Sequence, residues 1–155
     1  SLLITTTAAP TPNFNFTPPS DNRNNKTALS YALIVLSNRP GLLYTVVQLG
    51  NKSTPALTLS EIKYRISNNV QLSNQEDPIT GASPSVGVAN VPANTSVTVA
   101  PSGLAPGTTY TICGYLETTD GSVSAPICNT FVTSNATTSP VYKALITFSS
   151  NLTSV

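Results

Sequence analysis

Histidine is absent from this chain of 155 residues, and only six carboxylate side chains are present. Without an imidazole the chain has no His general base, no Ser-His-Asp triad and no His metal ligand. Glu76 and Asp77 are the one adjacent acidic pair, and Pro78 follows them in an expected loop. A calcium site needs several oxygen ligands that converge, and none is evident around this pair. We therefore expect no enzymatic activity, no metal site and no cofactor.

Long apolar runs and basic runs are also missing. No segment approaches the roughly 20 apolar residues of a membrane span. The formal net charge is +1, so no concentrated positive surface is available to bind nucleic acid. We expect neither a membrane span nor a nucleic-acid partner.

Charged residues make up only 8% of the chain, against about 25% in typical globular domains. Apolar residues make up 39%, which is enough for one domain with a hydrophobic core. N-linked glycans on Asn-x-Ser/Thr sequons would solvate a surface that has so few charges. A chain rich in Asn, Ser and Thr also forms such triplets by chance, but we expect at least two to be occupied. The sequons begin at Asn15, Asn25, Asn51, Asn94, Asn135 and Asn151.

The clearest strand pattern lies between residues 97 and 133, where polar and apolar residues alternate. Asp120-Gly121 is a strong hairpin signal within it. A hairpin built around that turn pairs residues whose numbers sum to 241. The pairs are Cys113 with Cys128, Tyr110 with Phe131, and Ile112 with Asn129. One register explains both the cysteines and the apolar alternation, which favours it.

This register predicts a disulfide between Cys113 and Cys128, although two free thiols remain an alternative. The spacing is not Cys-x-x-Cys, so a redox or zinc role has little support. Disulfides persist in oxidising compartments. The sequence also starts at Ser1 without a Met, as expected of a mature secreted protein whose signal peptide has been removed, or of a fragment. The predicted location is extracellular, either secreted or on the cell surface.

The stretch Leu104-Ala105-Pro106-Gly107-Thr108-Thr109-Tyr110, with Asp120-Gly121-Ser122 and Thr130-Phe131-Val132-Thr133, resembles the end of a fibronectin type III domain. Residues 40–47 resemble the third strand of a diverged version from repetitive extracellular surface proteins of microbes. The resemblance implies an all-β, fibronectin type III/immunoglobulin-like antiparallel β-sandwich over about residues 28–133. It also implies that Tyr110 is a structural tyrosine corner, with its hydroxyl bonded to backbone a few residues upstream. The family's usual core tryptophan has no counterpart, because the chain lacks tryptophan.

Extra segments flank the sandwich on both sides. We assign residues 1–27 to an N-terminal strand followed by a Pro-rich linker or edge strand, where Phe14 and Phe16 share a face and would dock on a sheet edge. Residues 134–155 form a C-terminal linker and an extra strand, or the start of a next repeat. An unpaired apolar strand is a template for another chain. The expected subunit-interface residues are Leu2, Leu3, Ile4, Val141, Tyr142, Leu145, Ile146 and Phe148.

Three segments inside the sandwich carry further expectations. Residues 28–36 are apolar on both faces, as if something covers the outer face. Residues 60–65 fit either a strand or a short helix, and we favour a single helical turn. Residues 67–92 contain Asn, Ser, Gly and three prolines, which predicts a long loop with one weak strand.

Two functions fit this organisation. The first is a secreted structural glycoprotein subunit that assembles head to tail with itself, or with neighbouring repeats, into a filament or surface array through terminal strand addition. The second is a cell-surface adhesion or carbohydrate-binding module that uses loop 67–92 or the face of Tyr115. Tyr115 lies beside the predicted disulfide, where ordinary cross-strand packing is the simpler interpretation. We favour the structural role, which the fold alone does not decide.

Overall fold

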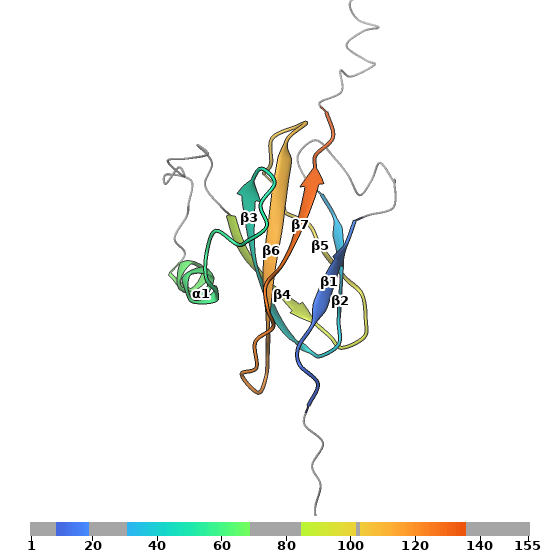
Figure 1. The fold of residues 1–155 in the computed structure, drawn as a ribbon, viewed down its shortest axis with the longest axis vertical. Coiled ribbons are helices and arrows are strands. Elements are labelled where there is room, and N and C mark those ends of the chain that lie inside the picture. Colours follow the sequence, from blue (N-terminus) through green and yellow to red (C-terminus); the bar gives the residue numbers. More distant parts are fainter. Residues whose placement is uncertain (1–8, 19–30, 69–84, 102, 136–155) are drawn as a thin grey trace, which may run out of the picture.

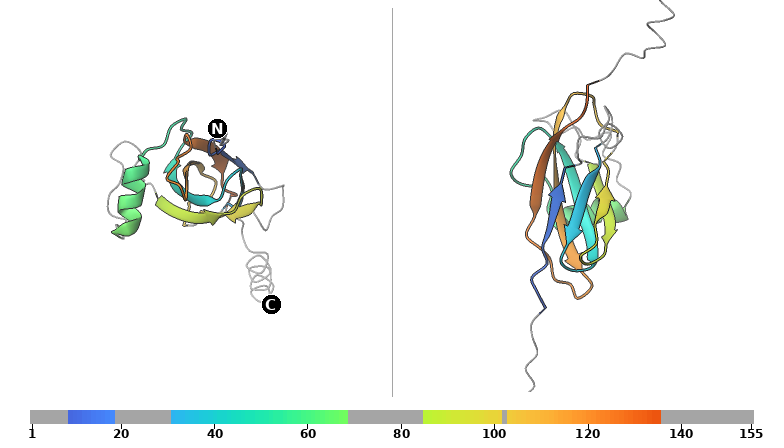
Figure 2. Two further views of the ribbon diagram at one scale, coloured as in Figure 1. Left: turned by 90° about the horizontal axis from the view of Figure 1, so that it is seen from below. Right: turned by 90° about the vertical axis from the view of Figure 1, so that its right-hand side faces the viewer.

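The computed structural model describes residues 9–18, 31–68, 85–101 and 103–135. In this part of the chain two antiparallel sheets pack face to face as a β-sandwich, which confirms the predicted all-β class (Figures 1 and 2). One sheet has the strand order β1-β2-β5 and the other has the order β4-β3-β6-β7. The elements are β1 (Phe14–Thr17), β2 (Leu33–Ser37), β3 (Gly41–Leu49), α1 (Leu59–Ser67), β4 (Ser85–Val91), β5 (Val97–Val99), β6 (Thr109–Thr118) and β7 (Ile127–Val132).

The main core lies between the two sheets and follows from the alternation of each strand. In β2, Leu33 and Val35 point inward and are fully buried, while Ile34 and Leu36 between them are exposed. The expectation of a cover over the outer face of this strand is therefore wrong for the described residues. The strand covered on both faces is β3, where six consecutive residues from Leu43 are buried.

Strand β1 docks on the sheet edge, as its two phenylalanines suggested. It pairs with β2 in an antiparallel register, and Phe14 and Phe16 are both buried. Gly114 makes room for them, because a Cβ there would lie 3.1–3.2 Å from the ends of the two rings. The sandwich therefore begins within the segment 1–27, earlier than the boundary at residue 28.

The β6–β7 hairpin has the predicted register, with Cys113 opposite Cys128 and Tyr110 opposite Phe131. Its loop is longer than a tight turn, because β6 ends at Thr118 and β7 starts at Ile127. Near the end of β6, Glu117 bridges to Val123 in the loop, a pairing offset by one residue from the strand register. The extra residue is accommodated before β7, in the manner of a β-bulge.

Helix α1 lies against the outer face of the four-stranded sheet (Figure 2). It has nine residues, so the expectation of a single turn was too short. The Thr58 side chain accepts from the N–H of Glu61, and the Glu61 carboxylate accepts from the N–H of Thr58, which completes a capping box. Ile62 is fully buried against the sheet, whereas Tyr64 is 63% exposed.

The expected weak strand within 67–92 is a full edge strand. Strand β4 pairs with β3 over seven residues, from Gly41↔Val91 to Val47↔Ser85. Residues 69–84 lie outside the described part of the chain, as do the two predicted terminal strands, residues 1–7 and 141–148, with all the interface residues assigned to them.

Candidate functional site

The two cysteines form the predicted disulfide on the outer face of the four-stranded sheet. Cys113 and Cys128 are directly opposite on β6 and β7, with their Cα atoms 4.1 Å apart. Cys113 has no exposed surface, and the alternative of two free thiols is wrong. The bond therefore ties the last two strands together from outside the main core.

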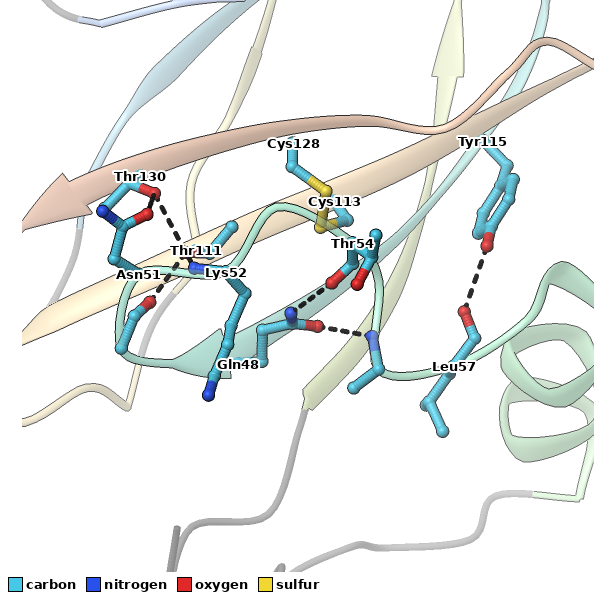
Figure 3. The surroundings of a disulfide bond; sticks show 12 residues. Gln48, Asn51, Lys52, Thr54, Leu57, Thr111, Cys113, Tyr115, Cys128 and Thr130 are labelled. Atoms are coloured by element: carbon cyan, nitrogen blue, oxygen red, sulfur yellow. Dashed lines mark hydrogen bonds between the residues drawn. A yellow bond between two sulfur atoms is a disulfide. The ribbon is translucent and has the colours of Figure 1, made fainter. Parts of the chain in front are cut away.

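The loop after β3 lies over this disulfide and is held there by polar side chains (Figure 3). The buried Gln48 donates from Nε2 to the carbonyl of Thr54 and accepts from the N–H of Ala56. The Thr111 hydroxyl donates to the carbonyl of Gly50 and accepts from the N–H of Lys52. Because these bonds fix both ends of the loop, the disulfide is part of a second, covered core.

Tyr115 belongs to this second core and is not a free aromatic platform. It packs against the cluster that contains Cys113 and Ile62, and its hydroxyl donates to the carbonyl of Leu57 at 3.2 Å (Figure 3). Burial raises the pKa of the Tyr115 hydroxyl above its ordinary value, and the negative charge of Glu61 adds to the effect. The packing interpretation of Tyr115 fits these contacts.

Tyr110 lies on the opposite face of β6, inside the sandwich. Its ring stacks on Phe131 with centroids 5.9 Å apart, and its hydroxyl accepts from the N–H of Ala105 at 2.8 Å. This backbone contact five residues upstream is the one expected of a tyrosine corner. It holds the loop before β6 against the strand.

Four of the six sequon asparagines lie in the described part of the chain, and all four are exposed: Asn15, Asn51, Asn94 and Asn135. Asn15 lies in strand β1 and not in a loop, on the face that points to solvent. The Oδ1 atom of Asn51 accepts from the Thr130 hydroxyl, so this bond does not involve the Nδ2 atom, to which an N-linked glycan would be attached. Asn25 and Asn151 are outside the described residues. Position in the fold therefore allows attachment at these four sites.

Four of the seven charged side chains in the described residues form two ion pairs, and the charges do not gather into a ligand site. Arg39 contacts Asp120 at 2.8 Å, and Lys63 of α1 contacts Glu117 of β6 at 3.0 Å. Over residues 9–18, 31–68, 85–101 and 103–135, no group of three His, Cys, Asp or Glu side chains is placed to hold a metal ion. No helix in that part of the chain has the length and apolarity needed to cross a bilayer.

An open edge of the sandwich lies between β4 and β5. A hollow of about 290 Å³ is present there, with β4 on one side, the end of β5 on the other, and Val47 and Ile112 among its lining. Sequence reasoning missed this feature, although a signal exists. Three of the four inward positions of β4, Ser85, Gly87 and Ala89, carry small residues, and the fourth, Val91, is buried in the main core.

The first described residues, before β1, are held against the turn between β2 and β3. The Nδ2 atom of Asn38 donates to the carbonyl of Thr11, and its Oδ1 atom accepts from the N–H of Asn13. Arg39 donates to the carbonyl of Pro10 while it contacts Asp120. The segment before β1 is therefore fixed along the long axis of the molecule, where it leaves one end of the sandwich (Figure 1).

Comparison with known proteins adds no relative. No protein-family model, no curated protein and no solved structure matches this chain. The class of protein is therefore defined by the fold and its sites: a two-sheet, all-β sandwich with one disulfide and a helix over the outer face of the larger sheet.

Proposed function

We propose that this protein is a secreted structural glycoprotein subunit that assembles head to tail into an extracellular filament or surface array. Assembly occurs by addition of a terminal strand of one copy to a sheet edge of the next. The observation that carries the proposal is the polarity of the sandwich. Phe14, where the chain enters, pairs with Ser37 at one end, and β7 runs to the other end, where residue 135 leaves (Figure 1).

The sheet edges that could accept a terminal strand are β4 and β5. Among the described residues, β4 pairs only with β3, and β5 pairs only with β2. A contact between a chain end and such an edge uses two different surfaces, so its repetition gives a linear assembly unless it closes into a ring. The apolar sequences of residues 1–7 and 141–148 supply candidate strands for it.

The extracellular setting is supported by two further features. A buried disulfide persists in an oxidising compartment. Exposed sequons on a chain with 8% charged residues offer glycans as the solvating groups. The three-plus-four strand arrangement and the Tyr110 backbone contact also support a fibronectin type III-like domain.

An adhesion or carbohydrate-binding role has less support. Its aromatic candidate, Tyr115, is hydrogen-bonded to Leu57 beneath α1 and the adjoining loop. Saturable binding of a glycan to a strictly monomeric chain would favour it over assembly.

The proposal is tested by measuring mass in solution for the full chain and for two deletions, of residues 1–7 and of residues 141–155. Light scattering after size exclusion should find large assemblies for the full chain and monomers for at least one deletion, with unchanged far-UV circular dichroism. Assemblies that survive both deletions would contradict strand addition.

A further inference from the structure

We propose that the hollow between β4 and β5 is the acceptor site for residues Leu2–Thr6 of a second copy of this chain. The inference rests on the proposed assembly and identifies its donor and its acceptor. The added segment continues the four-stranded sheet at β4 and places alternate side chains in the hollow.

The size and the lining of the hollow suit the side chains of one added strand. Inward side chains of an edge strand ordinarily fill the space between two sheets. Here Val91 fills the core at one end of β4, but the other inward positions, Ser85, Gly87 and Ala89, are small, so among the described residues the space above Val47 and Ile112 stays open. No charged side chain lines it among the residues that the structure describes, and in the same part of the chain the outward edge of β4 offers backbone N–H and C=O groups to an incoming strand.

The volume selects between the two candidate donors. A cavity of about 150 Å³ holds one benzene-sized group, so 290 Å³ takes about two aliphatic side chains. A strand over residues 2–6 presents Leu2 and Ile4 on one face, with Thr6 at the mouth. The apolar face of residues 141–148 presents Tyr142, Ile146 and Phe148, which exceeds this space.

Register places the donor and the acceptor at opposite ends of one molecule. The hollow lies where Val47 pairs with Ser85 and Leu33 pairs with Val99. Residues 10–13 lie at the other end, next to the pair Phe14 and Ser37, where Asn38 and Arg39 hold them by hydrogen bonds, and the donor segment directly precedes them in the chain. The segment therefore meets the hollow of a neighbour stacked on the same axis, not the hollow of its own sandwich.

The same geometry sets the strand direction. In a stack of copies, the segment of one copy reaches its neighbour at the end where β4 begins. The chain then runs from Thr6 near Ser85 to Leu2 near Ala89, antiparallel to β4. Leu3 and Thr5 point to the outer face of the sheet.

The donor is tested with a matched pair of full-length variants, Ile4→Asp and Leu3→Asp. A carboxylate that enters the hollow loses water and meets no positive charge among the described lining residues, whereas the same group on the outer face stays solvated. We expect Ile4→Asp to raise the concentration needed for filament formation at least tenfold, and Leu3→Asp to leave it within about twofold. Equal effects of the two substitutions would overturn the assigned face.

The acceptor is tested with Ala89→Leu, which fills the hollow, against Val88→Leu on the outer face of the same strand. Ala89→Leu should block filaments and keep its thermal unfolding midpoint, while Val88→Leu should assemble normally. A labelled peptide with the sequence of residues 1–7 provides a second measurement that does not depend on filaments. It should bind the Ile4→Asp protein saturably at one peptide per chain, and bind the Ile4→Asp/Ala89→Leu protein at least tenfold more weakly.

Mixing separates this inference from the proposed assembly. Ile4→Asp keeps an intact acceptor and Ala89→Leu keeps an intact donor, so together they should form dimers and stop there. Filaments of the unaltered chain that also form from Ile4→Asp, but are lost on deletion of residues 141–155, would overturn this donor and leave the assembly standing. A full chain that stays monomeric at every concentration would overturn both.

Discussion

Asp120 is held by three neighbours at the tip of the β6–β7 hairpin. The Arg39 guanidinium lowers the pKa of its carboxyl well below the ordinary value of 3.8, and the Thr118 hydroxyl and the Ser122 N–H act in the same direction. The same Arg39 bonds to the carbonyl of Pro10. One exposed ion pair therefore connects the hairpin tip, the β2–β3 turn and the segment before β1.

This pair predicts an acid-dependent loss of stability. A carboxyl whose pKa is lowered by folding stabilises the native state above its unfolded pKa, and that contribution is lost as the pH falls through about 4 toward the folded value. Thermal unfolding followed from neutral pH to about pH 2 should show a shallower decline for Asp120→Asn than for the unaltered chain. Identical pH profiles would contradict the pairing.

A second prediction concerns the disulfide. The bridge closes a loop with a sequence separation of 15, for which chain entropy gives a stabilisation of about 3 kcal/mol. Urea denaturation of Cys113→Ala/Cys128→Ala should show a lower unfolding free energy by about that amount. The inward-facing pair Tyr110 and Phe131 should keep its near-UV signal, because it lies on the other face of the hairpin. A loss of all tertiary signal would show that the bridge is required for the fold.

The elements differ in how far their sequence predicted them. The cysteines and the alternation specified the β6–β7 register, because a slip by one residue would move every side chain to the other face. The length of α1 was readable in part, since Thr58 and Glu61 form a capping box that was overlooked. The fold of loop 50–57 over the disulfide was not readable, because its contacts with Thr111 join residues far apart in the sequence.

Helix α1 is predicted to stabilise the sheet through one face only. Ile62 is fully buried in the second core, so Ile62→Ala should lower the unfolding free energy by about 2–5 kcal/mol. Tyr64 is 63% exposed on the same helix, and Tyr64→Ala serves as the control, with a change within about 0.5 kcal/mol. Chemical denaturation of both variants measures the difference. Equal losses would mean that the helix does not pack as described.

The whole molecule combines a closed side and an open side. At one edge β1 contacts β7 and the two sheets meet. At the other edge β4 and β5 diverge around a hollow that the sequence signalled only through three small residues on alternate positions. The three small residues can be interpreted only when β4 is known to pair with β3. That pairing could not be inferred from the sequence, because the stretch was assigned mainly to a loop. Residues 9 and 135, where the described chain begins and ends, lie at opposite ends of the sandwich, and the proposed donor end and acceptor end rest on this arrangement together with the open side.

The central claim is that copies of this chain join end to end. Negative-stain electron microscopy of the purified full chain, before and after enzymatic deglycosylation, tests it most directly. The account predicts unbranched fibres with an axial repeat of a few nanometres, about the length of one sandwich, that persist when the glycans are removed. Isolated globular particles under all conditions would contradict it.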